Sequence, residues 1–259
     1  MRVFARLALA SFVVSTSLVT VGQEAQRSKA DAHHPHWSYS GEGGPQHWGE
    51  LQPDFSTCKL GTYQSPIDIK AAAKSDLPAL QFGYRPAVLN FVDNGHTLMV
   101  TYAPGSTLTT VGKKYELKQF HFHRPSEERI NGKPLEMVVH LVHADAQGHL
   151  AVVAALVKAG KENPLFATLW KHVPRRKEQP ETNPDILVDA KDLLPDARGY
   201  YQFSGSLTTP PCTEGVDWYV LKTPIEASRD QISTFAKLYP NNARPAQPLH
   251  GRKIMETKD

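Results

Sequence analysis

Two histidines alternate with phenylalanine in the segment QFHFH, residues 119–123. Side chains at positions i and i+2 of a β-strand point to the same face, so His121 and His123 would stand side by side, with roots roughly 6 to 7 Å apart. Two imidazoles on one face supply half of the ligands of a zinc site. The alternative is an ordinary pair of histidines at the surface or at the edge of the core.

A catalytic zinc ion takes three protein ligands and keeps one position open for water, so a third imidazole is required. The segment EMVVHLVHAD supplies His140 and His143, whose offset of three puts them on opposite faces of a strand. The chain from His123 to His140 is long enough for a turn and an antiparallel return, which would place His140 beside the pair. Val142 would share that face as an apolar wall, whereas His143 is expected to be structural.

Strands must carry these side chains, and the surrounding sequence predicts them. Short apolar runs separated by turn signals fill residues 80–115. Residues 136–145 and 149–157 have the composition of two buried strands. We find no internal repeat and no domain boundary, and 259 residues can bury a large core in one domain. The sequence therefore predicts a strand-rich single domain.

A few helices are expected at its periphery. Asn163 followed by Pro164 predicts the start of a helix over residues 164–173. The capping-box pattern Ser228–Gln231 predicts a second helix, which ends before Pro240. The proline-rich and charged residues 174–185 are expected to form an exposed loop.

The N-terminus differs in character from the rest of the chain. Residues 1–32 combine two arginines, an apolar run and a polar stretch, which is typical of a secretory signal peptide followed by a linker. An uncleaved membrane anchor is the alternative. No later segment reaches 18 apolar residues, so residues 33–259 are expected to be free of the membrane after export. The formal net charge is only +3, and nothing indicates a nucleic-acid partner.

The chain has two cysteines, Cys58 and Cys212. In an exported protein an even number of cysteines favours a disulfide. The alternative is two free, buried thiols. A zinc site built on cysteines is disfavoured because the chain has no CxxC pair.

Several motifs resemble, in order and spacing, those of the alpha-class carbonic anhydrases, over about residues 36–253. The motifs are WSYSGEGGPQHWGEL, QSPIDI, VDNGH, QFHFH, PSEE, VVHLVH, GSLTTPPCTEGVDW and RPAQPLHGRKI. The pattern HxH alone is weak, but QFHFH followed by VHLVH and SLTTPPC is highly specific. The resemblance implies a mainly β fold with a large central, twisted, mostly antiparallel sheet and short helices around it.

The resemblance also implies reversible hydration of carbon dioxide to bicarbonate by zinc-bound hydroxide. The zinc ligands would be His121, His123 and His140. Thr208 would orient the hydroxide, and Glu127 would hold the hydrogen of this threonine. Other positions match residues that carry protons, fix ligand rings, order water or line an apolar pocket for carbon dioxide. These are His96 as the proton shuttle, Gln119 beside a ligand ring, Asn94 and Tyr39 near shuttle water, and Val142, Val152, Leu207, Thr209, Val216 and Trp218 in the pocket.

Simpler interpretations of these residues stay open at this point. His96 could be a surface histidine beside a turn. Glu127 could be a solvated charge next to Glu128, and Thr208 a plain strand residue. At the level of the whole protein, the rivals are a catalytically silent binding domain on the same fold and a metallohydrolase that acts on esters. Bound zinc would separate the silent domain from the enzyme.

One position departs from the family pattern. In many members a glutamate two residues before the third zinc histidine accepts its ring N–H, and here that position is Val138. Glu136 lies roughly 13 Å along the strand from His140 and is too distant to substitute. We therefore expect a backbone carbonyl or another acceptor to orient His140.

The resemblance further matches Cys58 and Cys212 to a family disulfide that would tie the Thr208 loop to the N-terminal region. The signal peptide and the absence of glycosylation sequons after it favour a bacterial periplasm, with secretion as the alternative. The expected partner is a small-molecule substrate, carbon dioxide or bicarbonate. The protein is expected to be a monomer or a homodimer.

Overall fold

The computed structural model describes residues 36–110 and 112–258, so the predicted signal peptide and linker, residues 1–32, lie outside the described part. The described residues belong to one compact unit. A 13-stranded sheet runs through this unit. Its strands are β2 (Ala73–Ser75), β3 (Gln81–Gly83), β4 (Ala87–Asp93), β5 (Leu98–Thr101), β6 (Thr107–Thr110), β7 (Lys113–His123), β10 (Met137–Ala144), β11 (Leu150–Ala159), β12 (Glu181–Val188), β13 (Tyr200–Ser206), β14 (Glu214–Leu221), β15 (Ile225–Ala227) and β16 (Met255–Thr257).

Shorter elements surround this sheet. A separate three-stranded sheet is formed by β1 (Asp68–Ile69), β8 (Arg129–Ile130) and β9 (Lys133–Pro134). The α-helices are α1 (Trp48–Leu51), α2 (Thr57–Leu60), α3 (Pro164–Lys171) and α4 (Arg229–Leu238). Single 3₁₀ turns occur at η1 (Gly41–Gly43), η2 (Pro53–Phe55) and η3 (Ala190–Leu193). None of the helices in residues 36–110 and 112–258 is long and apolar enough to cross a bilayer.

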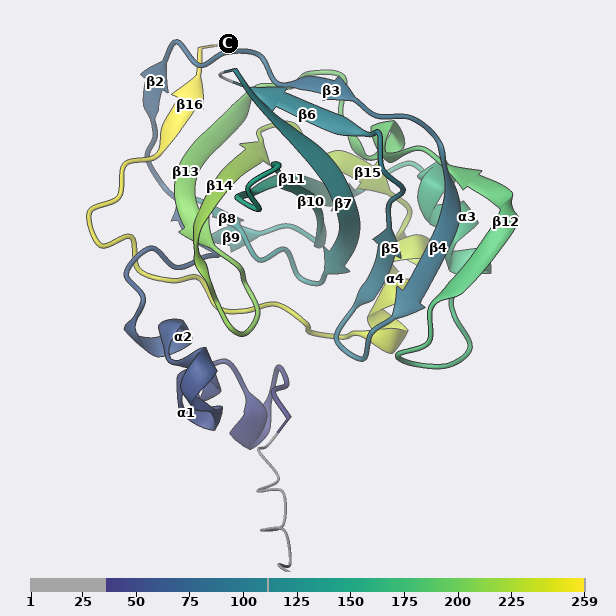
Figure 1. Ribbon diagram of the computed structural model, residues 1–259, viewed down its shortest axis with the longest axis horizontal. Coiled ribbons are helices and arrows are strands. Elements are labelled where there is room, and N and C mark those ends of the chain that lie inside the picture. Colours follow the sequence, from purple (N-terminus) through teal and green to yellow (C-terminus); the bar gives the residue numbers. More distant parts are fainter. Residues whose placement is uncertain (1–35, 111, 259) are drawn as a thin grey trace, which may run out of the picture. The chain divides into compact units, whose positions relative to one another are not determined.

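The large sheet is twisted and mostly antiparallel, as expected. Its main path has the order β12–β4–β5–β7–β10–β11–β14–β13–β16–β2. Parallel pairing occurs where β11 meets β14 and β15, and where β16 meets β2. The central strands β7, β10 and β11 run side by side (Figure 1). Each of these strands is therefore paired along both edges over part of its length.

Alternation along the strands sends side chains into two different environments. On one face, Val139, Leu141 and the residues in register with them join a large core that also takes Phe166 of α3 and Phe235 of α4. On the other face, Val138 belongs to a second apolar cluster with Trp218. The histidine triad described below lies on this second face. The large core therefore packs against the opposite face of the sheet.

Both predicted helix starts are confirmed. The Asn163 side chain accepts hydrogen bonds from the backbone N–H groups of Leu165 and Phe166, and Pro164 is the first residue of α3. The helix ends at Lys171, two residues before the predicted limit. Ser228 and Gln231 form the predicted capping box at the start of α4.

The prediction of a loop over residues 174–185 is wrong at its C-terminal end. Residues from Glu181 onward belong to β12, which pairs antiparallel with β4 at the edge of the sheet. The register shifts between Asn183 and Leu187, and Pro184 lies within this irregularity. A proline lacks the N–H group that a central strand needs, but an edge strand with a bulge tolerates it.

Candidate active site

The register of two strands assembles the histidine triad. His121 and His123 alternate along β7 with Phe120 and Phe122, which are fully buried in the large core. In the antiparallel pair, His140 of β10 lies directly opposite His121. One ligand atom from each of the three histidines falls within 4.8 Å of the others. The structure thus brings together the three predicted metal ligands.

Each ring is oriented by a hydrogen bond at one of its nitrogens. His121 Nδ1 lies 2.8 Å from Gln119 Oε1, and His123 Nδ1 donates to the backbone carbonyl of Asn242 at 2.7 Å. His140 Nε2 lies 3.2 Å from the carboxylate of Glu128. The nitrogens left for a metal are therefore Nε2 of the first two rings and Nδ1 of the third.

The residues present fit a metal ion. His123 Nε2 is buried and has no hydrogen-bond partner. A buried polar atom without a partner is costly in a folded protein, so it calls for an explanation. Three convergent imidazole nitrogens are a donor set that suits Zn²⁺, and a fourth position can remain open. A cation at this point would satisfy the unpartnered nitrogen.

Burial keeps two of the ligand rings neutral. It lowers the pKa of His121 to about 3 and the pKa of His123 well below its ordinary value, with repulsion from His140 adding to both effects. Burial also opposes the charged form of His140, but the attraction and hydrogen bond of Glu128 outweigh it and raise the pKa of His140. A metal ion requires neutral imidazoles, and at His140 it would replace a proton.

Glu127 and Thr208 form a buried pair beside the triad. Glu127 Oε1 accepts a hydrogen bond from the backbone N–H of Arg244 at 2.7 Å, and an interaction with the Thr208 side chain is among the effects that lower the pKa of Glu127. Burial raises the pKa of Glu127 to about 7, although the charge on His140 lowers it. Glu127 is only 1% exposed, so it is not a solvated surface charge.

An apolar wall stands next to the third histidine. Val152, Val216 and Trp218 are buried in one cluster, and Val142 and Leu207 pack against it. The ring centroid of Trp218 lies 5.0 Å from that of His140. The five apolar residues that were predicted to line the pocket therefore lie together beside the ring of His140.

A cavity of about 130 Å³ opens in front of the triad. Thr209, Tyr39, Asn94 and His96 line it together with His121, among other residues. Asn94 Oδ1 accepts hydrogen bonds from the backbone N–H groups of His96 and Thr97, which fixes the turn that presents His96. The predicted mouth residues thus share one cavity with two of the three predicted metal ligands, His121 and His123.

The ring of His96 is half-buried in this mouth. It stacks on Trp37, with centroids 3.6 Å apart and planes inclined by 10°. Burial, reinforced by repulsion from His36 and Lys177, lowers the pKa of His96 to about 4. His96 is therefore more than a histidine exposed beside a turn.

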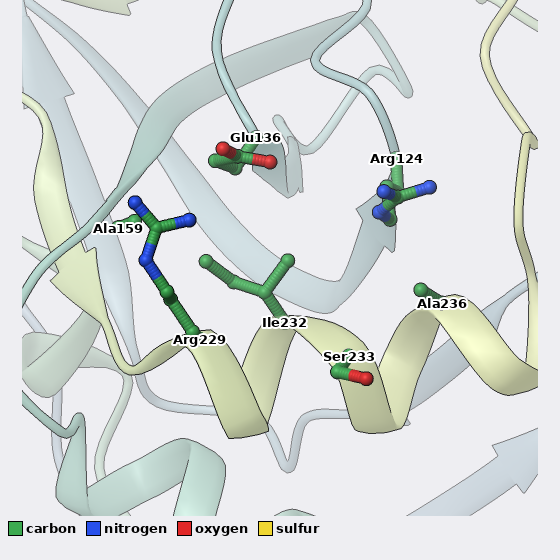
Figure 2. A pocket seen from close by; sticks show the side chains of 7 residues that line it. All are labelled: Arg124, Glu136, Ala159, Arg229, Ile232, Ser233 and Ala236. Carbon is green, nitrogen blue, oxygen red and sulfur yellow. The ribbon is translucent and has the colours of Figure 1, made fainter.

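Glu136 is excluded as the acceptor for His140, as expected. Glu136 lines a surface pocket of about 230 Å³, and Figure 2 shows it there with Arg124 and with Arg229 and Ile232 of α4. Its side chain is exposed, whereas the Glu128 side chain is fully buried. The sequence analysis missed Glu128, although two signals pointed to it: the valine at position 138 and the second glutamate in PSEE. No sequence pattern could have indicated that the backbone carbonyl of Asn242 orients His123, because every residue carries a backbone carbonyl.

The Thr208 loop is tied to the N-terminal part of the described chain. Cys58 and Cys212 form a disulfide across a sequence separation of 154 residues. Gln64 adds a hydrogen bond to the backbone carbonyl of Cys212 at 3.1 Å. The backbone N–H of Cys212 in turn donates to the carbonyl of Thr209 at 2.8 Å. The alternative of two free thiols is therefore wrong.

Comparison with known proteins identifies the family of this fold and site. Residues 43–258 match the family model described as eukaryotic-type carbonic anhydrase. The chain belongs to the carbonic anhydrase family. The carbonic anhydrase of Nostoc sp. (strain PCC 7120) is 44% identical over 234 residues, which cover 88% of this chain and 89% of that protein. The carbonic anhydrase of Pectobacterium carotovorum is 45% identical over 222 residues, covering 85% and 90% of the two chains.

A solved carbonic anhydrase structure agrees with the sequence comparison. The alpha-carbonic anhydrase of Thermovibrio ammonificans, in complex with the inhibitor sulfanilamide, matches with a TM-score of 0.82 and 44% identity, covering 85% of this chain and 98% of that chain. Carbonic anhydrases are enzymes that hydrate carbon dioxide, and the chain belongs to this class. The family generally depends on zinc, and the triad of this carbonic anhydrase could hold a metal ion.

Proposed function

We propose that this chain binds one zinc ion through His121, His123 and His140 and uses it to interconvert carbon dioxide and bicarbonate. The convergence of one ligand atom from each of these rings within 4.8 Å carries the proposal. The buried, unpartnered Nε2 of His123 supports it, because a cation there would supply the missing partner. The family membership supplies the class of reaction.

Bound zinc would supply Lewis acidity that lowers the pKa of a coordinated water from 15.7 to about 7. The chain's own residues would orient the reactants. With its hydroxyl proton directed to Glu127, Thr208 would only accept a hydrogen bond from the attacking oxygen. The apolar wall around Val142 and Trp218 suits a neutral, linear substrate such as carbon dioxide. These groups act without a charged clamp on the substrate.

Each hydration cycle also releases a proton. His96 lines the same cavity as two of the ligand histidines and lies near the residues that form its mouth. The ordinary pKa of histidine, about 6.5, suits reversible proton transfer near neutral pH. Burial lowers the pKa of His96 to about 4, so this ring would release an accepted proton readily. His96 would accept the proton at a ring nitrogen, and Asn94 and Tyr39 would order the water between that ring and the triad.

The test combines rate and metal content on the purified protein. Stopped-flow hydration of carbon dioxide, with zinc measured per chain, is expected to show rapid turnover and about one zinc per chain. His140→Ala should lose both. Sulfanilamide, which the Thermovibrio ammonificans relative binds as an inhibitor, should suppress the turnover of the parent. Stoichiometric zinc without hydration would overturn the proposed activity and leave a silent binding domain.

We also propose that residues 1–32 direct export to the periplasm and that residues 33–259 are the mature enzyme. The disulfide between Cys58 and Cys212 supports export, because such bonds persist in oxidising compartments. N-terminal sequencing of protein from the periplasmic fraction tests this, and an intact Met1 there would contradict it.

Light scattering on the same sample distinguishes the expected monomer or homodimer from larger assemblies.

A further inference from the structure

We propose that Glu128 is the positioning residue for His140 and does the work that many family members assign to a glutamate at position 138. The inference rests on the proposed zinc site. Both carboxylate oxygens of Glu128 lie 3.2 Å from His140 Nε2, and both side chains are buried. The carboxylate that faces His140 therefore comes from the segment that precedes β8, whereas position 138 belongs to β10, the strand of His140 itself.

The environment of position 138 explains why a carboxylate is absent there. Val138 is fully buried in the apolar cluster that contains Trp218, and it lies opposite His123 on one side and Leu156 on the other. A glutamate there would have to bring its charge into apolar surroundings. The valine instead extends the apolar wall, while the acceptor reaches the ring from a different part of the chain.

The backbone around Glu128 is held on several sides. Its carbonyl accepts a hydrogen bond from Ser126 Oγ at 2.7 Å, and Ser126 Oγ in turn accepts from the backbone N–H of Leu135. The next residue, Arg129, donates its backbone N–H to the carbonyl of Ile67. A buried carboxylate on such a fixed backbone presents its oxygens in a constant place, as a positioning group must.

The placement of the carboxylate has a chemical consequence for the ring. A carboxylate facing Nε2 favours the tautomer that carries its proton on that nitrogen, which leaves the lone pair at Nδ1. Nδ1 lies 3.8 Å from Glu127 Oε2, the oxygen that also lies 3.5 Å from His123 Nε2. Glu128 also supplies negative charge behind the ligand, which makes the imidazole a stronger donor to a cation.

Glu128→Gln is the primary test because it keeps the shape of the side chain and removes its charge. Zinc dissociation constants, measured by competition with a chelator, are expected to rise by about 10- to 100-fold. Glu136→Gln is the matched control: this carboxylate is exposed and lines the pocket of Figure 2, so zinc binding should stay at the parent level.

A second readout does not depend on bound zinc. ¹⁵N NMR of the metal-free protein, at a pH high enough for the His140 ring to be neutral, should find the His140 proton on Nε2 in the parent and a less biased mixture in Glu128→Gln. Unchanged zinc affinity together with an unchanged tautomer in that variant would overturn the role of Glu128 while leaving the zinc enzyme intact. A folded parent that binds no zinc would overturn the proposed function, and the tautomer measurement would still decide the orientation of the ring.

Discussion

The imidazole of His96 lies stacked on the indole of Trp37, with ring centroids 3.6 Å apart. This contact helps to bury the ring, and burial is the largest cause of its low pKa of about 4. A shuttle with so low a pKa would hold its proton for only a short time at neutral pH. The stacked position therefore favours proton release to solvent over proton storage.

Removal of the indole should raise the pKa of His96. In Trp37→Ala the ring gains water, so its pKa should move from about 4 towards 6.5. NMR titration of the His96 ring measures the change directly. Trp37→Phe, which retains an aromatic surface, is the control and should shift the pKa less. Identical titration curves in all three proteins would show that stacking does not set this pKa.

Removal of His96 should slow proton export but spare the chemical step. His96→Ala is expected to lower kcat in dilute buffer by about 10²-fold, while kcat/KM changes little, because general acid–base groups contribute factors of this size. High concentrations of an imidazole buffer should restore kcat. A variant with the parent rate in dilute buffer would remove His96 from the proton path.

Loss of the Thr208 hydroxyl should reduce the rate without releasing the metal. Thr208→Val keeps the shape of the side chain but leaves Glu127 without that hydrogen bond, and kcat/KM should fall by about 10²-fold. Zinc content should equal that of the parent. Thr234→Val, on α4 and outside the cavity lining, is the comparison and should keep the activity of the parent. Equal losses in the two variants would argue against a special role for Thr208.

Opening the disulfide should weaken both the fold and the Thr208 loop. Closing a loop of this length contributes on the order of 5 kcal/mol in the chain-entropy model. The double variant Cys58→Ser/Cys212→Ser is expected to lose about 2 to 5 kcal/mol of unfolding free energy in urea. Hydrogen exchange near Thr208 should accelerate. Unchanged exchange and stability would mean that the surrounding hydrogen bonds already fix the loop.

His143 should make the fold sensitive to acid. Burial lowers its pKa from 6.5 to about 4, so as the pH falls the unfolded chain takes up this proton before the folded protein does. The stabilisation is complete above pH 6.5 and is lost progressively towards pH 4, to an extent of about 3 kcal/mol. Urea unfolding of zinc-free protein at pH 7 and pH 4.5 measures the loss.

His143→Gln is the matching variant because its amide does not titrate but can still accept a hydrogen bond from Tyr84, the partner of His143. It should lose less stability on acidification than the parent does. His149→Gln, on an exposed side chain, should behave as the parent. The same acid loss in parent and His143→Gln would assign the sensitivity to other groups.

The triad could be predicted from the sequence because two simple features determine it. One is the alternation of side chains along a strand, and the other is a single antiparallel return of the chain. Once QFHFH is a strand, His121 and His123 share a face, and His140 needs only the neighbouring register. The acceptor Glu128 could not be placed in the same way, since its side chain reaches the ring from a segment outside the strand. Sequence patterns report the direction of side chains along an element better than contacts between elements.

The edge of the sheet shows a similar limit. Charge and prolines in residues 174–185 favour a loop, and local propensity alone gives no reason for a strand. Pairing with β4 nevertheless draws Glu181–Val188 into the sheet. Tertiary pairing outweighs local preference there, because an edge position requires hydrogen bonds on one side only.

The position of the triad in the middle of the sheet bears on which ions the protein can accept. β7 is hydrogen-bonded to β5 and β10, and β10 to β7 and β11, so the backbones beneath the three rings have little freedom to adjust. Divalent transition metals differ in preferred geometry, and Cu²⁺ outcompetes Zn²⁺ in a site that can adapt to it. A site mounted on interior strands resists such adaptation. We therefore expect the sheet to favour ions whose coordination geometry matches the fixed positions of the three rings.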